Sequence, residues 1–136
     1  DSYFFKFINA FAANDPSSTL KTWEMIKDNL APDKFAIFLN TRVDRQYRTI
    51  QLINLIFDKL KPEALVLRGE NFPKELDLLI DSNKDIKVFK FPYSVKQKDL
   101  IKFMGNSLND FMILGIGNIV GWGEVLMKKM KEFKVD

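Results

Sequence analysis

The first residues that could do chemistry follow a strand-like run, Tyr3–Phe11, and precede an amphipathic helical pattern. Asp15 is expected to cap that helix, and Pro16 suits its first position because the missing N–H would be unpaired there. Asn14, Asp15 and Ser17 therefore gather an amide, a carboxylate and a hydroxyl beside a helix N-terminus. In an open α/β sheet this point lies beyond the carboxyl end of a strand, where ligands bind. A well-capped helix without any ligand would show the same pattern.

A second group is rich in arginine. Three of the four arginines, Arg42, Arg45 and Arg48, fall within seven residues, whereas the 17 lysines are scattered along the chain. The fork-shaped guanidinium suits carboxylate or phosphate, so Arg42 and Arg45 predict an anion site with Asp44 between them. The alternative is a salt-bridged helix start. Arg48, one turn further on, is assigned to the solvated face.

A third group is the glycine-rich run Leu114–Gly121. Glycines after a strand let backbone N–H groups approach an anion, and the following helix adds its positive end. The spacing of Gly115, Gly117 and Gly121 does not fit a dinucleotide fingerprint, because the third glycine comes one residue late. The run predicts a small-anion site or a tight turn without a ligand. The chain has no phosphate-loop motif of the form G-x-x-x-x-G-K-[ST].

The elements that must position these groups alternate along the chain. Continuous apolar runs are typical of parallel strands covered on both faces, and helical periods lie between them. The pattern predicts a single domain over residues 1–136 with an α/β, doubly wound, mostly parallel sheet and helices on both faces. Ser94–Gln97 is interpreted as a capping box for the fourth helix. The two tryptophans are interpreted as core residues. Strands are expected near residues 3–11, 35–39, 64–67, 86–91 and 111–114.

Composition limits the class of function. The chain is 46% hydrophobic and 29% charged, which is typical of a globular protein. It contains no Cys and no His, so thiolate chemistry, Ser-His-Asp triads and most zinc sites are excluded. The balance of 21 basic and 18 acidic residues is too mild to indicate nucleic-acid binding. No apolar run is long enough to span a membrane, and no signal peptide is recognisable, so a soluble cytoplasmic domain is expected.

Three stretches give the chain a family resemblance. They are Phe7–Leu20 (FINAFAANDPSSTL), Leu39–Arg45 (LNTRVDR) and Leu114–Ile119 (LGIGNI), and they fall in register with the expected strand order. In these stretches the chain resembles the C-terminal domain of the poly-γ-glutamate synthase ligase subunit, the capsule biosynthesis protein CapB. That family is an outlying branch of the Mur-ligase-like amide ligases. The resemblance covers nearly the whole chain and implies a Rossmann-like fold of the Mur ligase C-terminal type.

The resemblance also implies an activity. Enzymes of this family use ATP and Mg²⁺, held mostly by a central domain, to turn a carboxylate into an acyl phosphate that an amino group attacks. The substrates are glutamate and the growing polyglutamate chain, and small membrane subunits are partners at the cytoplasmic membrane face. This chain is then a C-terminal fragment that is expected to be inactive alone.

The roles of individual residues follow from the same resemblance. The residues that lie beside the ATP ribose would be Asn14, Asp15 and Ser17. Arg42, Asp44 and Arg45 would line the cleft where the glutamate and the γ-phosphate meet. The wall that holds the carboxylate of the amino acid would be shaped by Gly115, Gly117 and Asn118. Such chemistry needs no His, because catalysis is mostly positioning and charge neutralisation.

One position departs from the family pattern, and two other functions remain open. The pattern reads Gly-Asn-Ile-His-Gly, and this chain has Val120 in place of the His, which leaves the exact acceptor open. The first alternative is a non-catalytic doubly wound domain that binds a small anion or a protein partner. The second is another Mur-like ligase, such as a folate-polyglutamylating one. The sequence Ala12–Ser18 (AANDPSS) argues against this second alternative.

Overall fold

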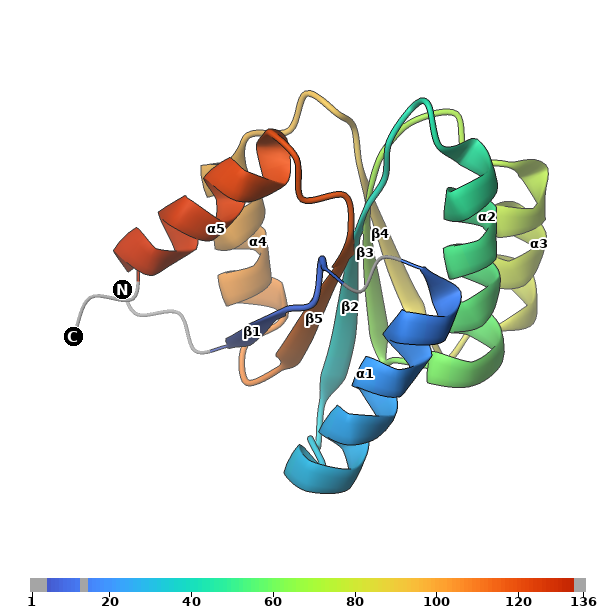
Figure 1. Cartoon of the computed structure of the whole chain (residues 1–136), viewed down its shortest axis with the longest axis horizontal. Helices are drawn as coiled ribbons and strands as arrows, with labels where there is room; N and C mark the ends of the chain where they lie inside the picture. The colour runs from blue at the N-terminus through green and yellow to red at the C-terminus, as the bar shows by residue number, and fades with distance from the viewer. Residues whose placement is uncertain (1–4, 13–14, 134–136) are drawn as a thin grey trace.

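The computed structural model describes residues 5–12 and 15–133, in which five parallel strands alternate with helices (Figure 1). The strand order across the sheet is β1-β5-β2-β3-β4. The predicted α/β fold with a parallel, doubly wound sheet is therefore confirmed. In chain order the elements are β1 (Lys6–Asn9), α1 (Pro16–Leu30), β2 (Phe35–Asn40), α2 (Gln46–Leu55), the π-helical segment η1 (Ile56–Leu60), β3 (Ala64–Arg68), α3 (Lys74–Ser82), β4 (Lys87–Phe91), α4 (Gln97–Ser107), β5 (Met112–Gly117) and α5 (Trp122–Phe133).

The three central strands are buried along their whole length, as their continuous apolar sequences predicted. Every residue of β2, β3 and β5 is buried. The outer strands differ, because Lys6 and Asn9 of β1 and Lys87 and Lys90 of β4 are exposed. A strand covered by helices on both faces needs apolar side chains on both, whereas an outer strand also borders solvent.

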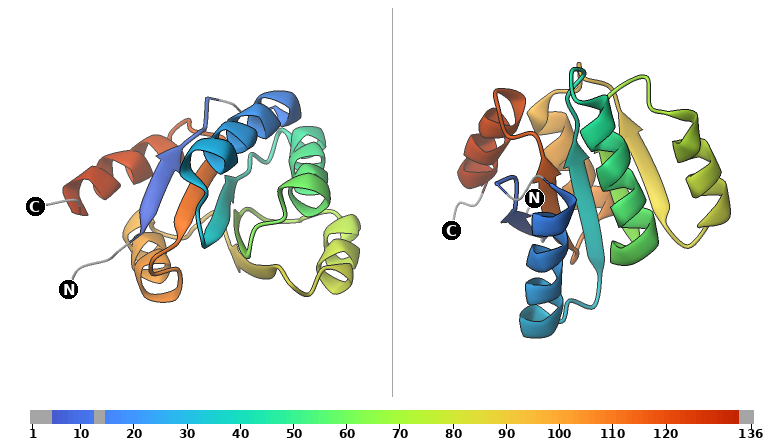
Figure 2. Two further views of the ribbon diagram at one scale, coloured as in Figure 1. Left: turned by 90° about the horizontal axis from the view of Figure 1, so that it is seen from below. Right: turned by 45° about the vertical axis from the view of Figure 1, so that its right-hand side comes forward.

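Helices cover both faces of the sheet (Figure 2). One face carries α1, α2 and α3, and the opposite face carries α4 and α5. Each face has its own hydrophobic cluster, and β2 contributes to both. Ile37 and Leu39 belong to the cluster beneath the first three helices, whereas Ala36 and Phe38 belong to the cluster beneath the last two. This alternation is the two-residue period of a strand.

The last strand lies between the first two. β5 pairs in parallel with β1 on one side and with β2 on the other, so that Gly115 is opposite both Asn9 and Phe38. The chain leaves β2 toward α2 on one face of the sheet and leaves β5 toward α5 on the other. The two strand ends therefore send the chain to opposite faces, which defines the switch point where open α/β sheets bind ligands.

The start of α1 has the predicted cap. Asp15 accepts a hydrogen bond from the backbone N–H of Ser18 at 2.9 Å, and Pro16 is the first helical residue. The helix ends at Leu30 and is capped by Ala31, whose left-handed backbone (φ 40°) lets its N–H reach the carbonyl oxygens of Ile26 and Lys27. Both ends of this helix are thus defined by local hydrogen bonds.

The predicted capping box at the start of α4 is wrong. The residue that caps this helix is Lys96, not Ser94, and it makes no side-chain cap hydrogen bond. Gln97 instead donates from its side chain to the Trp122 carbonyl oxygen at 3.3 Å, which ties the start of α4 to the start of α5. Within residues 5–12 and 15–133, no helix has both the length and the apolar character needed to cross a membrane.

Candidate functional site at the carboxyl edge of the sheet

The predicted site residues lie at one edge of the sheet. Asp15 follows β1, Arg42 and Arg45 follow β2, and Asn118 follows β5. Because the strands are all parallel, these loops share the carboxyl edge of the sheet. Asn14, which was predicted to belong with them, lies outside the described residues.

Asp15 is held by Ser18. One carboxylate oxygen accepts from the Ser18 backbone N–H at 2.9 Å and the other accepts from the Ser18 hydroxyl at 2.8 Å. These hydrogen bonds hold the pKa of Asp15 below its ordinary value of 3.8, and the positive charge of Arg48 adds a smaller effect in the same direction. Arg48, which was expected on the solvated face, is half-buried. Ser17 is exposed beside this cap.

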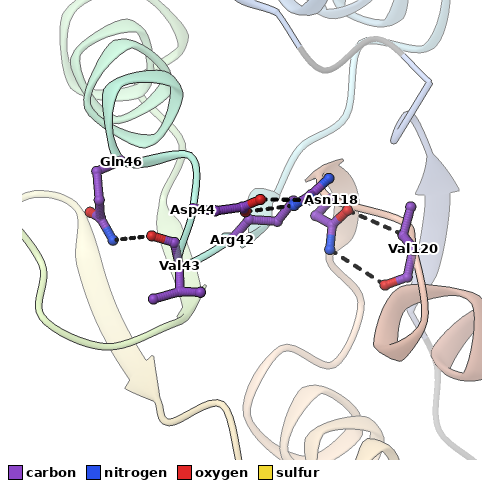
Figure 3. Close-up of polar contacts among 6 residues, drawn as sticks. All are labelled: Arg42, Val43, Asp44, Gln46, Asn118 and Val120. Atoms are coloured by element: carbon purple, nitrogen blue, oxygen red, sulfur yellow. Dashed lines mark hydrogen bonds and ion pairs between the residues drawn. The ribbon is translucent and has the colours of Figure 1, made fainter.

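Arg42 and Asp44 form a bidentate ion pair in the loop after β2 (Figure 3). Arg42 donates from Nε to Oδ1 and from Nη2 to Oδ2 of Asp44, both at 2.9 Å. The Arg42 hydrogen bonds are the main reason that the pKa of Asp44 lies below its ordinary value. Arg45 is exposed at the N-cap of α2 without a side-chain cap hydrogen bond. Arg42 is thus already partnered, whereas the Arg45 side chain faces solvent.

Gly115 and Gly117 of β5 are each required for a different local reason. A Cβ on Gly115 would lie 2.5 Å from the ring of Phe7, so close packing alone requires a glycine there. Gly117 has φ +97° and a Cβ there would overlap the Asn40 carbonyl oxygen. Gly117 is therefore required by the turn that carries the chain out of the sheet. Gly115 lies inside the strand and Gly117 at its end.

Asn118 is fixed on both sides. Its backbone N–H donates to the Asn40 carbonyl oxygen at 2.8 Å, and its own carbonyl oxygen accepts from the Asn40 side chain at 2.7 Å. The Asn118 side chain accepts from the Val120 N–H at 3.2 Å and turns the chain toward α5 (Figure 3). Val120, which stands where the family pattern has His, is 63% exposed. The ends of β2 and β5 are thus joined rigidly at the switch point.

Arg68 belongs to this edge, and sequence reasoning missed it. It is the last residue of β3 and only 8% exposed. Its Nη1 donates to the Asn40 side-chain oxygen and its Nη2 to the Tyr93 carbonyl oxygen, both at 2.8 Å. Its Nε is buried and has no hydrogen-bond partner. The signal in the sequence was a single Arg directly after the apolar run Ala64–Leu67.

Two aromatic rings lie against the Arg68 guanidinium. The Trp122 ring centroid is 4.2 Å from its Cζ and that of Tyr93 is 5.1 Å away. The Trp122 indole N–H donates to the Val95 carbonyl oxygen at 2.9 Å, which fixes the ring. Although Trp122 packs on the second hydrophobic cluster, as its core interpretation predicted, it also contacts a charged group at the site.

The loop after β2 is tied to β3 and to Tyr93. Thr41 donates its hydroxyl to the Arg68 carbonyl oxygen at 2.9 Å and lies 2.9 Å from the Tyr93 hydroxyl. Because the Thr41 proton is committed to the carbonyl, the Tyr93 hydroxyl is the donor of the second bond. A Cβ on Gly69 would overlap the Thr41 hydroxyl oxygen, so that position has no room for a side chain.

An open pocket of about 260 Å³ lies where these loops meet, and we call it the edge pocket. It brings together the predicted Arg42, Asp44 and Asn118, but Asp15, Arg45, Gly115 and Gly117 are not among the residues that line it. The lining residues are Thr41, Arg42, Val43, Asp44, Arg68, Tyr93, Asn118, Val120 and Trp122.

The electrostatics of Arg68 favour an anion in this pocket. Burial lowers the pKa of Arg68, with Tyr93 and Glu70 acting in the opposite direction, but a guanidinium stays charged at neutral pH. Burying a cation costs several kcal/mol, whereas a cation–π contact returns about 0.5–2 kcal/mol. No described carboxylate forms an ion pair with Arg68. The described residues also contain no group of three or more acidic, His or Cys residues that could hold a metal ion.

Together, the fold and this pocket define a doubly wound parallel α/β domain with a basic pocket at the switch point of its sheet. Residues 3–133 match the family model of the poly-gamma-glutamate synthase CapB C-terminal domain, and the chain belongs to that family.

Two curated relatives match nearly the whole chain. It is 32% identical over 131 residues to the PGA synthase CapB of Bacillus subtilis (strain 168). The matched region covers 95% of this chain and 33% of that protein. It is also 30% identical over 133 residues to the capsule biosynthesis protein CapB of Bacillus anthracis. This matched region covers 95% of this chain and 28% of that protein. The chain thus spans about a third of the length of these relatives.

Proposed function

We propose that this chain acts as the C-terminal domain of an ATP-dependent amide ligase that joins glutamate units into poly-γ-glutamate through an acyl phosphate. Family membership over residues 3–133 supports this proposal. The observation that carries it is the edge pocket, where the cations Arg42 and Arg68 lie beside Asn118 at the switch point. Such a pocket suits the carboxylate of an incoming amino acid and the phosphoryl group that activates its partner.

The predicted site residues lie in separate places on the carboxyl edge of the sheet. Arg42, Asp44 and Asn118 line the pocket and would position the incoming glutamate and the end of the polyglutamate chain. Arg45, at the exposed start of α2, would contact an anion that approaches from outside.

Asp15 and Ser17, at the start of α1, would face the ribose of ATP. ATP would supply the phosphoryl group, and Mg²⁺ would be held mostly by residues outside this chain. The small membrane subunits of the synthase are the proposed partners.

In this proposal Gly115 and Gly117 shape the backbone around the site and do not themselves contact the substrate. Gly115 lets Phe7 pack against β5, and Gly117 lets the chain turn toward Asn118. The carboxylate wall is then built by Asn118, whose backbone is joined to Asn40. Val120 replaces the His of the family pattern, so the acceptor is held without a hydrogen bond from that position.

The test is the glutamate-dependent ATP turnover of the complete polypeptide that contains this chain. We expect turnover from the complete polypeptide and none from the 136 residues alone, because this chain has no phosphate-loop motif. The control is the complete polypeptide with the Lys of its phosphate loop replaced by Met. ATP hydrolysis by the 136-residue chain alone, or no glutamate dependence in the complete polypeptide, would contradict the proposal.

A further inference from the structure

We infer that Arg68 receives an oxyanion of the ligand in the edge pocket, and this inference rests on the proposed function. The oxyanion is either the carboxylate of glutamate or a phosphoryl group, which share the same recognition chemistry. The inference adds a residue that lies outside the arginine cluster of the loop after β2. It comes from the burial and hydrogen bonding of that single side chain.

The first argument is the unused donor capacity of Arg68. A guanidinium has five N–H groups, and the hydrogen bonds to Asn40 and Tyr93 use two of them. Its Nε is buried without a partner, which is rare because buried donors are nearly always satisfied. An unsatisfied donor on a residue that lines a pocket is explained by a ligand that completes it.

The second argument is charge. Both acceptors that hold Arg68 are neutral, and no described carboxylate forms an ion pair with it. Arg42, on the same pocket, differs because Asp44 already neutralises it. Arg68 is therefore the cation of the edge pocket that no described carboxylate pairs with directly, and Glu70 acts on it without an ion pair.

The third argument is preorganisation. Asn40 and Tyr93 fix the two ends of the guanidinium, and the Trp122 ring lies 4.2 Å from its Cζ. A charged group held in one orientation binds an anion with little further loss of side-chain freedom. The buried Nε has no hydrogen-bond partner, so its N–H resonance reports whether a ligand oxygen binds this guanidinium.

The direct test is an NMR titration of the arginine Nε–H resonances of this chain. The chain has four arginines, and the resonance that is lost in Arg68→Lys identifies Arg68. Glutamate and inorganic phosphate are titrated separately at constant ionic strength, with sodium chloride as the control salt. We expect the Arg68 resonance to shift in a saturable manner with glutamate or phosphate and to stay unchanged with sodium chloride.

The two arms separate the sources of the oxyanion. Saturation at the lower concentration of glutamate assigns the site to a carboxylate, and saturation at the lower concentration of phosphate assigns it to a phosphoryl group. No saturable shift with either anion, or the same shift with sodium chloride, overturns the inference.

A matched variant places a counter-charge inside the protein. Asn40→Asp keeps the shape of the side chain and presents a carboxylate to Arg68 at the position of the present 2.8 Å contact. It also loses the hydrogen bond that the amide donates to the Asn118 carbonyl oxygen, so the melting temperature of the variant is measured beside its affinity. We expect the affinity for the anion to fall about 10- to 100-fold, because Arg68 is then neutralised. The control is Lys87→Met, which removes an exposed cation at the opposite end of β4 and should leave the affinity unchanged. Equal affinities for Asn40→Asp and the parent chain would overturn the inference.

Fluorescence provides a second readout on the folded chain. Trp23 stacks on Phe35 at 3.9 Å and is replaced in Trp23→Phe, so that Trp122 becomes the sole tryptophan. Ligand contact at Arg68 should change Trp122 emission with the same concentration dependence as the NMR shift, and unchanged emission would contradict it. These measurements need no turnover, so anion binding without ligase activity would reject the proposed function and leave the Arg68 site in place.

Discussion

Asn40 and Asn118 exchange two hydrogen bonds across the ends of β2 and β5, one in each direction. The Asn40 side chain donates to the Asn118 carbonyl oxygen at 2.7 Å, and the Asn118 N–H donates to the Asn40 carbonyl oxygen at 2.8 Å. The oxygen of the same Asn40 side chain accepts from Arg68 at 2.8 Å. One buried amide therefore sets the position of both sides of the edge pocket.

Replacing Asn40 by Ala should destabilise the domain by roughly 2–4 kcal/mol. The change removes the side-chain donor to the Asn118 carbonyl oxygen and the acceptor of the buried Arg68 Nη1, whose guanidinium then keeps only its bond to Tyr93. Denaturant unfolding of the two chains measures the difference. Asn29→Ala is the matched control, because Asn29 makes an exposed side-chain bond to the Met25 carbonyl and should change stability by less than about 0.5 kcal/mol. Similar losses in both variants would contradict the assigned role of Asn40.

Gly117→Ala and Gly121→Ala should have clearly different effects. Both glycines have positive φ, +97° and +70°, but only at Gly117 would a Cβ overlap the Asn40 carbonyl oxygen. The change at Gly121, which has open space around it, should cost about 1 kcal/mol from backbone strain alone. We expect more than about 2 kcal/mol at Gly117, where strain and overlap add. Thermal unfolding distinguishes the two, and an equal loss of stability would refute the overlap.

Asp15 should make the stability of the domain depend on pH in the acid range. Its pKa is lowered in the folded state, so the stabilisation is complete above its ordinary value of 3.8 and is lost as the pH falls through the lower folded value. In Asp15→Asn the amide oxygen can still cap α1 but cannot titrate. We expect similar melting temperatures at pH 7 and a shallower decline below about pH 4 for the variant. Parallel curves over the whole range would contradict this assignment.

Arg42→Ala and Arg45→Ala test the proposed anion contacts in the complete polypeptide. If each holds phosphate or carboxylate in the transition state, its loss costs about 2–4 kcal/mol, or about 30- to 1,000-fold in glutamate-dependent ATP turnover. The melting temperature should change little, because Arg45 is exposed and the Arg42–Asp44 pair is largely exposed. Lys87→Ala is the control for general loss of charge. Unchanged turnover in both arginine variants would reject the contacts.

The fold was largely predictable from local pattern. Phe35–Leu39 and Ala64–Leu67 are continuous apolar runs, and both proved to lie within central strands buried on both faces. The cap at Asp15 was predictable because it depends on residues within one turn. The capping box at Ser94 failed because a short polar motif does not fix the first helical residue, and Gln97 found a partner on α5 instead.

The centre of the site was not predictable in the same way. Arg68 ends β3, Tyr93 follows β4 and Trp122 begins α5. They meet only because of the strand order and of how the helices pack. The local sequence around each of these three residues gives no indication that the other two lie beside it. The π-helical segment η1 was also missed, because the apolar spacing of Ile53, Phe57 and Leu60 fits an ordinary α-helix as well.

The position of β5 has a consequence for how this protein folds during synthesis. In the described sheet β1 pairs only with β5, so that Ile8 finds its partner at Leu114 near the end of the chain. Until the ribosome has released β5, the first strand has no neighbour and one edge of β2 stays open. Long-range strand pairing is slow, and unpaired edges in the nascent chain favour aggregation. The segment β2–β4 can assemble early, whereas closure of the sheet must wait for the last strand.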